Sequence, residues 1–378
     1  MKKRHMVWIA GGILAAGVVG FGGWLFTLPP ASATAAAPAI APEEAQATLA
    51  ALKPKRQRPL IAVIGINDAT ETTDYVMPTG ILRRADVADV LLVATGPGRV
   101  ALYPALTVEP DTTVADFNAS HPDGADYVIV PAMSRDDDPA ALQFIKEQSA
   151  KGALIIGICF GVKVVAATGL LDNKRGTAHW FALKELRKKH PTMQYVANRR
   201  LVVDHAVVTT TGITASIPMS LTLIEAIAGR DKAEAVAREI GLDHWDARHA
   251  SDAFKFTRPF AMTVMSNKLA FWNRDQLGIE LAPGIDEVSL ALSADAWSRT
   301  YRSRALTFAG AQDAITTRNG IRIIPDRAAR PKEDVVNGFT DRPPAEALDR
   351  TLAGIGSRYG ASTRYVVAMQ LEYPQKTQ

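Results

Sequence analysis

The sequence predicts an α/β protein with a flavodoxin-like, doubly wound parallel sheet. Two observations support this. Short apolar, largely β-branched runs alternate with helical patterns, and one such run, Leu154 to Ile158, turns abruptly into a helix. The only cysteine, Cys159, stands at that turn between Gly157 and Gly161. This glycine spacing is that of a nucleophile elbow, where a strained turn lifts a side chain above the sheet.

The position of Cys159 allows two interpretations. Backbone N–H groups at a helix N-terminus favour an anion, so a thiol held there tends toward thiolate and serves as a nucleophile. The alternative is a small buried hydrophobic residue, because free cysteine is among the most buried residue types.

Residues 1–30 have the composition of a membrane anchor. Three basic residues precede an uncharged run, Met6 to Leu28, which carries Trp8 and Trp24 near its ends. We expect a single-pass inner-membrane protein whose globular part lies in the periplasm. A cleavable signal peptide is the alternative, since Ala31-Ser-Ala33 has the small-x-small form of a cleavage site. A single cysteine outside the cytoplasm forms no internal disulfide, so the thiol is either sheltered or used.

Charge and spacing exclude several kinds of partner. The chain of 378 residues has 43 basic and 39 acidic residues, intermixed, with a formal net charge of +4. Without a basic stripe and interleaved aromatic residues, we predict no nucleic-acid binding. His244 and His249 are too far out of helical register to share a metal ion, so we predict no metal. No other cofactor is predicted.

The first part of the chain divides into a linker and a domain. Residues 31–58 are rich in Ala and Pro and predict a semi-extended linker that holds the globular part off the bilayer. Residues 59–258 form the α/β domain. Its predicted strands are 59–65, 90–94, 126–131 and 154–158, followed by a hairpin of 200–204 with 206–210. Its predicted helices are 75–84, 139–149, 162–167, 182–190, 216–229 and 231–240.

The second part, residues 259–378, contains a faint repeat of the first. Residues 281–325 repeat the strand, helix, strand and hairpin order of residues 60–115, and no second cysteine elbow follows. We therefore predict a smaller, degenerate and chemically silent α/β half-repeat. Residues 344–358 are expected to be helical and residues 364–373 to form a late strand.

Four blocks in residues 59–245 resemble the DJ-1/PfpI superfamily of class I glutamine amidotransferase-like domains. The third block resembles the branch that contains isocyanide hydratases and the amino-terminal domains of AraC-type regulators. The four blocks are Asp74 to Pro78, Ile158 to Gly161, Leu170 to Trp180 and Thr211 to Ser216.

The resemblance implies a catalytic set. Cys159 would be the reactive centre, Asp74 the acid that hydrogen-bonds its sulfur, and His179 a neighbour in the same pocket. A thiolate attacks while a carboxyl group or an imidazole moves the proton. Asp74 could instead be a plain helix-start carboxylate, and His179 a structural residue beside Trp180.

The resemblance also implies residues of an oxyanion site or pocket. They are Phe160, Gly161, Met133, Gly212, Ile213 and Thr214. Two departures weaken a hydrolase interpretation: Phe160 replaces the histidine that follows the cysteine in amidase and protease members, and Met133 lies where paired glycines are usual. In the repeat, Ser289 falls at the position of the acid.

Three functions remain open on the sequence alone. The first is an enzyme using Cys159 on a small electrophile such as an isocyanide, a reactive carbonyl or an amide. The second is a small-molecule or redox sensor, and the third a degenerate structural domain. Homodimers are common in the family, and here the repeat could occupy that surface.

Overall fold

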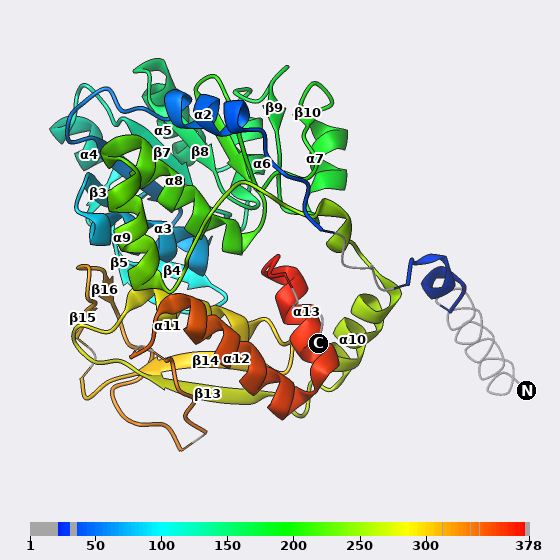
Figure 1. The fold of residues 1–378 in the computed structure, drawn as a ribbon. Coiled ribbons are helices and arrows are strands. Elements are labelled where there is room, and N and C mark those ends of the chain that lie inside the picture. Colours follow the sequence, from blue (N-terminus) through cyan, green and yellow to red (C-terminus); the bar gives the residue numbers. More distant parts are fainter. Residues whose placement is uncertain (1–21, 31–35, 312, 333, 340, 375–378) are drawn as a thin grey trace, which may run out of the picture.

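A seven-stranded sheet forms the centre of residues 59–258 in the computed structural model (Figure 1), which describes residues 22–30, 36–311, 313–332, 334–339 and 341–374. The strand order is β11-β12-β8-β7-β1-β3-β6, and neighbours are parallel except in the β11–β12 hairpin. This confirms the predicted doubly wound sheet. The strands are β1 (Leu60–Gly65), β3 (Asp89–Ala94), β6 (Thr112–Thr113), β7 (Tyr127–Val130), β8 (Leu154–Gly157), β11 (Leu201–Asp204) and β12 (Val207–Thr210).

Helices cover both faces of the sheet. Successive side chains of a strand point to opposite faces, and the apolar side chains on each face are buried under helices. In β1, Ile61 and Val63 join one hydrophobic cluster, whereas Ala62 and Ile64 join another. The first cluster lies under α3 (Thr72–Ala85), α8 (Ser216–Ala228) and α9 (Arg230–Ile240). The second lies under α4 (Val114–Ser120), α5 (Pro139–Ala150) and α6 (Gly161–Ala167). The domain also contains the small elements β9 (Arg175–Gly176), α7 (Leu183–Lys189) and β10 (Gln194–Tyr195).

The segment predicted as a spacer packs against the domain instead. Helix α2 (Pro42–Ala51) lies on α8 and β11 (Figure 1), and Arg199 forms an ion pair of 2.6 Å with Glu44. The hydroxyl of Tyr127 also donates to the carbonyl of Leu52. The prediction of a free linker over 31–58 is therefore wrong from residue 42 onward, because Leu52 is buried in the main hydrophobic cluster.

Residues 1–21, most of the predicted membrane span Met6 to Leu28, lie outside the described residues. Residues 22–27 are helical. None of the described helices combines the length and the apolar composition that a bilayer span requires.

Residues 275–323 have the order strand, helix, strand and hairpin, and the first strand of this segment begins at residue 275 rather than 281. Its β13 (Asp275–Glu280) and β14 (Ser303–Phe308) pair in parallel, as β1 and β3 do, and α11 (Glu287–Ser298) connects them. Its hairpin, β15 (Ile315–Thr316) and β16 (Arg322–Ile323), continues the sheet of the first half. The resulting five-stranded order is β15-β16-β5-β4-β2, which includes β2 (Asp68–Glu71), β4 (Val100–Tyr103) and β5 (Thr107–Glu109).

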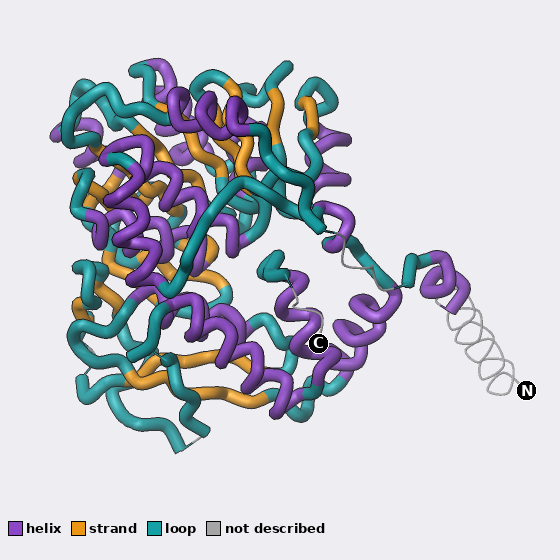
Figure 2. The backbone as a smooth tube through the Cα atoms, in the orientation of Figure 1, coloured by secondary structure: helices purple, strands orange, loops and turns teal. Residues whose placement is uncertain are grey.

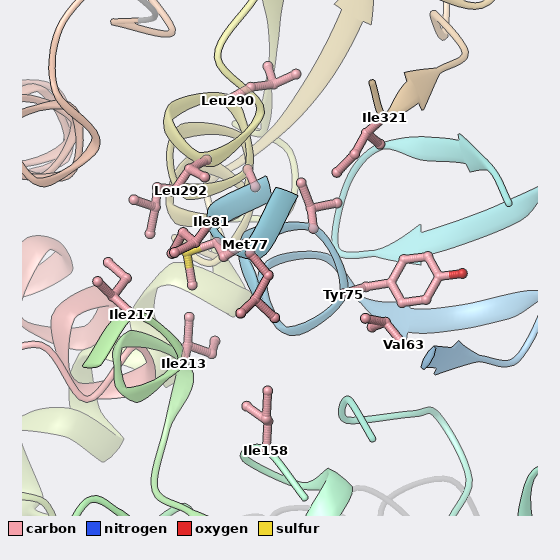
Figure 3. Close-up of a cluster of buried hydrophobic side chains, with 14 of the residues drawn as sticks. Val63, Tyr75, Met77, Ile81, Ile158, Ile213, Ile217, Leu290, Leu292 and Ile321 are labelled. Atoms are coloured by element: carbon pink, nitrogen blue, oxygen red, sulfur yellow. The ribbon is translucent and has the colours of Figure 1, made fainter. Parts of the chain in front are cut away.

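Helices α3 and α11 pack against each other between the two halves. Figure 3 shows Ile81 and Met77 of α3 near Leu292 of α11, and these residues belong with Leu290 to one continuous hydrophobic cluster. All four side chains are buried. The hydrophobic core therefore runs from one half of the chain into the other.

Two reciprocal ion pairs close the ends of this helix pair. Glu71 caps the start of α3 and binds Arg299 at the end of α11, with an Oε1–Nη2 distance of 2.6 Å. Asp286 caps the start of α11 and binds Arg84 in the last turn of α3. The helices are thus antiparallel, and equivalent positions of the two repeats pair with each other.

The predicted late strand over 364–373 is wrong. Helix α13 (Ala361–Gln370) occupies it, following α12 (Pro344–Tyr359) and packing against α10 (Arg258–Leu269). The local run of valine and tyrosine favours a strand. The helix forms because Val366 and Met369 enter a small core with Phe254 and Phe260, while Val367 enters the main cluster.

We predict that Arg84→Ala destabilises the protein strongly. The substitution leaves the Asp286 carboxylate buried without its main cation, which costs about 3–5 kcal/mol. Urea unfolding followed by circular dichroism measures the change. Arg58→Ala, which removes the exposed pairs with Asp86 and Asp89, is the matched control and should change the midpoint little. Equal effects of the two substitutions would contradict the structural role of the buried pair.

Candidate functional site

Cys159 lies at the carboxyl end of β8, immediately before α6, with a φ of 56°. Its side chain is only 4% exposed, and its N–H donates to the carbonyl of Thr211 at 3.1 Å. Gly161 makes this turn possible, because a Cβ there would lie 2.0 Å from the carbonyl oxygen of Val130. The local geometry is therefore that of the predicted elbow.

A cavity of about 490 Å³ opens beside Cys159, between the first domain and the C-terminal helices. Its walls are mainly aromatic and aliphatic. The first domain contributes Met133, Phe160, His179 and Ile213, and the second part contributes Phe260, Val264, Arg299 and Tyr301. The half-repeat predicted to be chemically silent thus supplies part of the wall.

A buried cluster of three carboxyl groups and one guanidinium adjoins this cavity. Arg299 donates to Glu71 and, through Nε at 2.6 Å, to Asp295. Glu71 Oε2 accepts the Thr73 hydroxyl at 2.8 Å and the N–H of Asp74 at 2.6 Å. One cation therefore faces three acids, all of them shielded from water.

Burial governs the protonation of these acids. Removal from water raises the pKa of Asp74 to about 7, and it raises the pKa of Glu71 and of Asp295 above their usual values as well. The charge of Arg299 opposes each of these shifts without cancelling it. We conclude that the cluster retains at least one acidic proton near neutral pH.

The thiol of Cys159 is not pre-ionised by this environment. Burial first, and then the charges of Asp74 and Glu71, raise its pKa well above the usual range, against a lowering contribution from Arg299. The expected tendency toward thiolate from the start of α6 is outweighed by burial. Attack by the sulfur would therefore require the proton to leave as the substrate binds.

Asp74 lies close to the elbow but does not hydrogen-bond the sulfur. Its Oδ2 accepts the N–H of Ala132 at 3.1 Å, and its buried Oδ1 has no hydrogen-bond partner among the described residues. The predicted contact with Cys159 is not formed in this structure. An unpartnered buried oxygen is costly, so this atom is available to a substrate or to the thiol.

His179 lines the cavity, but both of its ring nitrogens are already engaged. Nε2 donates to the carbonyl of Gln370 at 3.0 Å, and Nδ1 accepts the N–H of Phe181 at 3.1 Å. Burial lowers the pKa of His179, which favours this neutral tautomer. In this state the ring attaches the C-terminal segment to the domain.

The remaining predicted pocket residues separate into two groups. Met133, Phe160 and Ile213 line the cavity. Gly161, Gly212 and Thr214 do not. The N–H of Gly161 donates to Ile158 and that of Gly212 donates to Glu372, so neither is free to bind an oxyanion. Thr214 donates its hydroxyl to the carbonyl of Glu372 at 3.0 Å. Among the described residues, no three His, Cys, Asp or Glu side chains are arranged so that they could hold a metal ion.

The sequence around this site is similar to that of known proteins. The DJ-1/PfpI family model matches residues 61–226. Isonitrile hydratase of Pseudomonas putida is 31% identical over 202 residues, which cover 52% of this chain and 84% of that protein. The chain belongs to the DJ-1/PfpI family.

The chain is also similar to a transcriptional regulator and, in fold, to a solved structure. The HTH-type transcriptional regulator CdhR of Pseudomonas aeruginosa is 33% identical over 104 residues, or 28% of this chain and 31% of that protein. The crystal structure of Drosophila melanogaster DJ-1beta is 23% identical, with a TM-score of 0.45, and the match covers 50% of this chain and 100% of that one. Isonitrile hydratase and CdhR confirm the predicted branch of the DJ-1/PfpI family.

The DJ-1/PfpI match includes Cys159, Asp74 and Glu71 but ends before Asp295 and Arg299. Sequence reasoning missed Glu71, Asp295 and Arg299. For Arg299 a signal existed: it stands at the end of the repeat's helix, as Arg84 does in the first half.

We predict opposite effects on the thiol from two substitutions in this cluster. Asp74→Asn removes a negative charge and should shift the pH profile of Cys159 alkylation by iodoacetamide to lower pH. Arg299→Gln removes the cation that lowers the pKa of this thiol and should shift the profile to higher pH. General loosening of the site would accelerate both variants alike, and that result would contradict the electrostatic account.

We also predict a pH-dependent stabilisation by Asp74→Asn. Between pH 3.8, the usual pKa, and about 7, the folded protein holds a proton on Asp74 that the unfolded chain has lost, so rising pH favours unfolding. Each unit of pKa difference is worth about 1.4 kcal/mol. Urea unfolding should therefore show no gain for the variant at pH 3.5 and a gain of about 2–4 kcal/mol at pH 8.

The exposed carboxyl of Asp123 provides the control for charge removal at the surface. A stability difference between Asp74→Asn and the wild type that stays constant with pH would contradict the raised pKa.

Proposed function

We propose that this protein is an enzyme in which Cys159 adds to a small apolar electrophile, with isocyanide hydration as the first candidate reaction. The observation that carries the proposal is the strained cysteine at the wall of an aromatic cavity, next to carboxyl groups that retain a proton. The 31% identity to isonitrile hydratase supports the choice of substrate class.

The proposed chemistry follows from the local groups. The sulfur forms a bond to the electrophilic carbon, while the thiol proton passes through a neighbouring carboxyl group to the substrate. Water then adds to the same carbon, the carbon–sulfur bond breaks, and a proton returns to the sulfur. An isocyanide and one water would thus yield one N-substituted formamide, without an oxidant or a reductant.

Asp74 is the preferred proton carrier. Its pKa of about 7 lets it both give and accept a proton at neutral pH, and Oδ1 has no other partner among the described residues. Arg299 would act through Glu71 as a positioning residue, because Glu71 in turn binds the N–H of Asp74.

A redox sensor is less well supported. Sensor cysteines are accessible and have a low pKa, whereas Cys159 is nearly covered and its thiol pKa is raised. Reactive carbonyls and amides remain alternative substrates for the same thiol. Anchoring in the inner membrane through Met6 to Leu28, with the domain in the periplasm, is a separate proposal that rests on the sequence.

The test is the conversion of benzyl isocyanide to its formamide by the full chain, measured by mass spectrometry. Cys159→Ser should lose at least 100-fold in turnover because its hydroxyl is a far weaker nucleophile. Asp74→Asn should lose turnover even though its thiol ionises more readily. Lys146→Ala, on the exposed side of α5, is the control for expression and purification of a variant and should keep the turnover of the wild type. Undiminished turnover in Cys159→Ser, or no turnover of isocyanide, methylglyoxal or a simple amide by the wild type, would contradict the proposal.

A further inference from the structure

Helix α10 has two different faces. On one, Phe260, Val264 and Lys268 line the cysteine cavity at a spacing of four residues. The other face is apolar and exposed: Met262 is 50% and Leu269 60% accessible. The two aromatic side chains just beyond the helix are more exposed than these, Phe271 at 66% and Trp272 at 76%. Large side chains at such exposure, gathered on one segment, are typical of a binding surface.

The charge of this segment has one sign. Residues 253–274 contain Lys255, Arg258, Lys268 and Arg274, and no acidic residue. Lys255 and Arg274 are exposed and form no ion pair with the described residues. A helix with exposed Met and Leu, neighbouring Phe and Trp, and only basic charges has the composition of an interfacial amphipathic helix.

The start of α10 also meets the end of the N-terminal apolar run. Arg258 donates to the carbonyls of Leu25, Phe26 and Leu28 at 3.0–3.3 Å, and its guanidinium lies 5.0 Å from the ring centre of Phe26. In Figures 1 and 2 the short helix of residues 22–27 lies near the start of α10. Residues 6–21, which precede this helix in the sequence, carry no charged side chain. The described end of the apolar run therefore contacts the first residue of α10.

We propose that the outer face of α10, together with Phe271 and Trp272, lies on the surface of a lipid bilayer that contains anionic lipids. Tryptophan and phenylalanine insert at the level of the headgroups, and the unpaired basic side chains neutralise lipid phosphates. A bilayer is favoured over a protein partner because the segment combines basic and aromatic residues and contacts residues 25–28, the end of the apolar run. The proposal does not depend on the chemistry of Cys159.

This arrangement would place the cysteine cavity next to the membrane surface. Lys268 is both exposed and part of the cavity wall, so the mouth of the cavity and the proposed lipid contact share a border. An apolar substrate dissolved in lipid would then have a short path to the thiol.

The chain's single cysteine makes a site-specific test practical. In the full chain carrying Cys159→Ser, an environment-sensitive fluorophore is attached at Leu269→Cys or, as matched control, at Lys146→Cys on α5. Each protein is mixed with vesicles of phosphatidylcholine alone or with phosphatidylglycerol. We expect a blue shift at position 269, only with the anionic vesicles, and none at position 146.

Two further variants define the contact. The combined substitution Lys255→Gln, Lys268→Gln and Arg274→Gln should lower the apparent affinity for the anionic vesicles by about fivefold for each lost charge. This affinity is read from the lipid concentration at which half of the shift is reached. In the chain with native Cys159, brominated lipid should quench less fluorescence after Trp272→Phe. This second readout guards against misfolding of the serine variant.

Several results would overturn the proposal. A shift without vesicles that grows with protein concentration would indicate a second copy on this face. Equal shifts at positions 269 and 146 would show non-specific adsorption. If the protein floats with vesicles while position 269 stays aqueous, the apolar run anchors the chain but α10 lies off the bilayer. If it neither floats nor shifts, both membrane proposals fail.

Discussion

The packing of α11 against α3 is the interaction on which the rest of the structure depends. It joins the hydrophobic cores of the two halves, and its ends are fixed by the Arg84–Asp286 and Arg299–Glu71 pairs. The second pair lies beside Cys159. The contact that holds the halves together therefore also brings a guanidinium to the site. Without α11, the carboxyl of Glu71 would have no nearby cation among the described residues.

The electrostatics of the site follow from an imbalance between buried acids and buried cations. Three carboxyl groups and a thiol share one guanidinium, and the low dielectric of the interior makes each additional negative charge unfavourable. The groups therefore keep protons that they would lose in water. Such a cluster is poorly suited to a permanently charged thiolate and well suited to a proton that moves when the substrate arrives.

The sequence predicted the first domain well, because its signals are local. Buried strands are short apolar runs, and the glycines around Cys159 are required by a single tight turn. The late strand over 364–373 failed because local β-branched residues were outweighed by packing of α13 against α10 and α12. The prediction of a free linker over 31–58 failed for a similar reason, since nothing in an Ala- and Pro-rich composition shows that Leu52 is buried against the domain.

The site could be predicted only where its residues lie on the first domain. Cys159 and its cavity neighbours Phe160 and Ile213 come from motifs. Glu71 and Arg299 are 228 positions apart, and their meeting depends on how the second half folds back. His179 matched a motif, yet its ring is occupied by Gln370 and Phe181, which no pattern near residue 179 reveals.

The internal repeat has an evolutionary consequence. In an assembly of identical subunits, any substitution at a shared contact appears on both sides at once. Here the two counterparts are encoded separately, so one copy can keep Asp74 while the other carries Ser289 at the same capping position. Separate encoding of this kind lets the first half keep the cysteine and its acid while the second half changes into a partner that supplies Arg299 and part of the cavity wall.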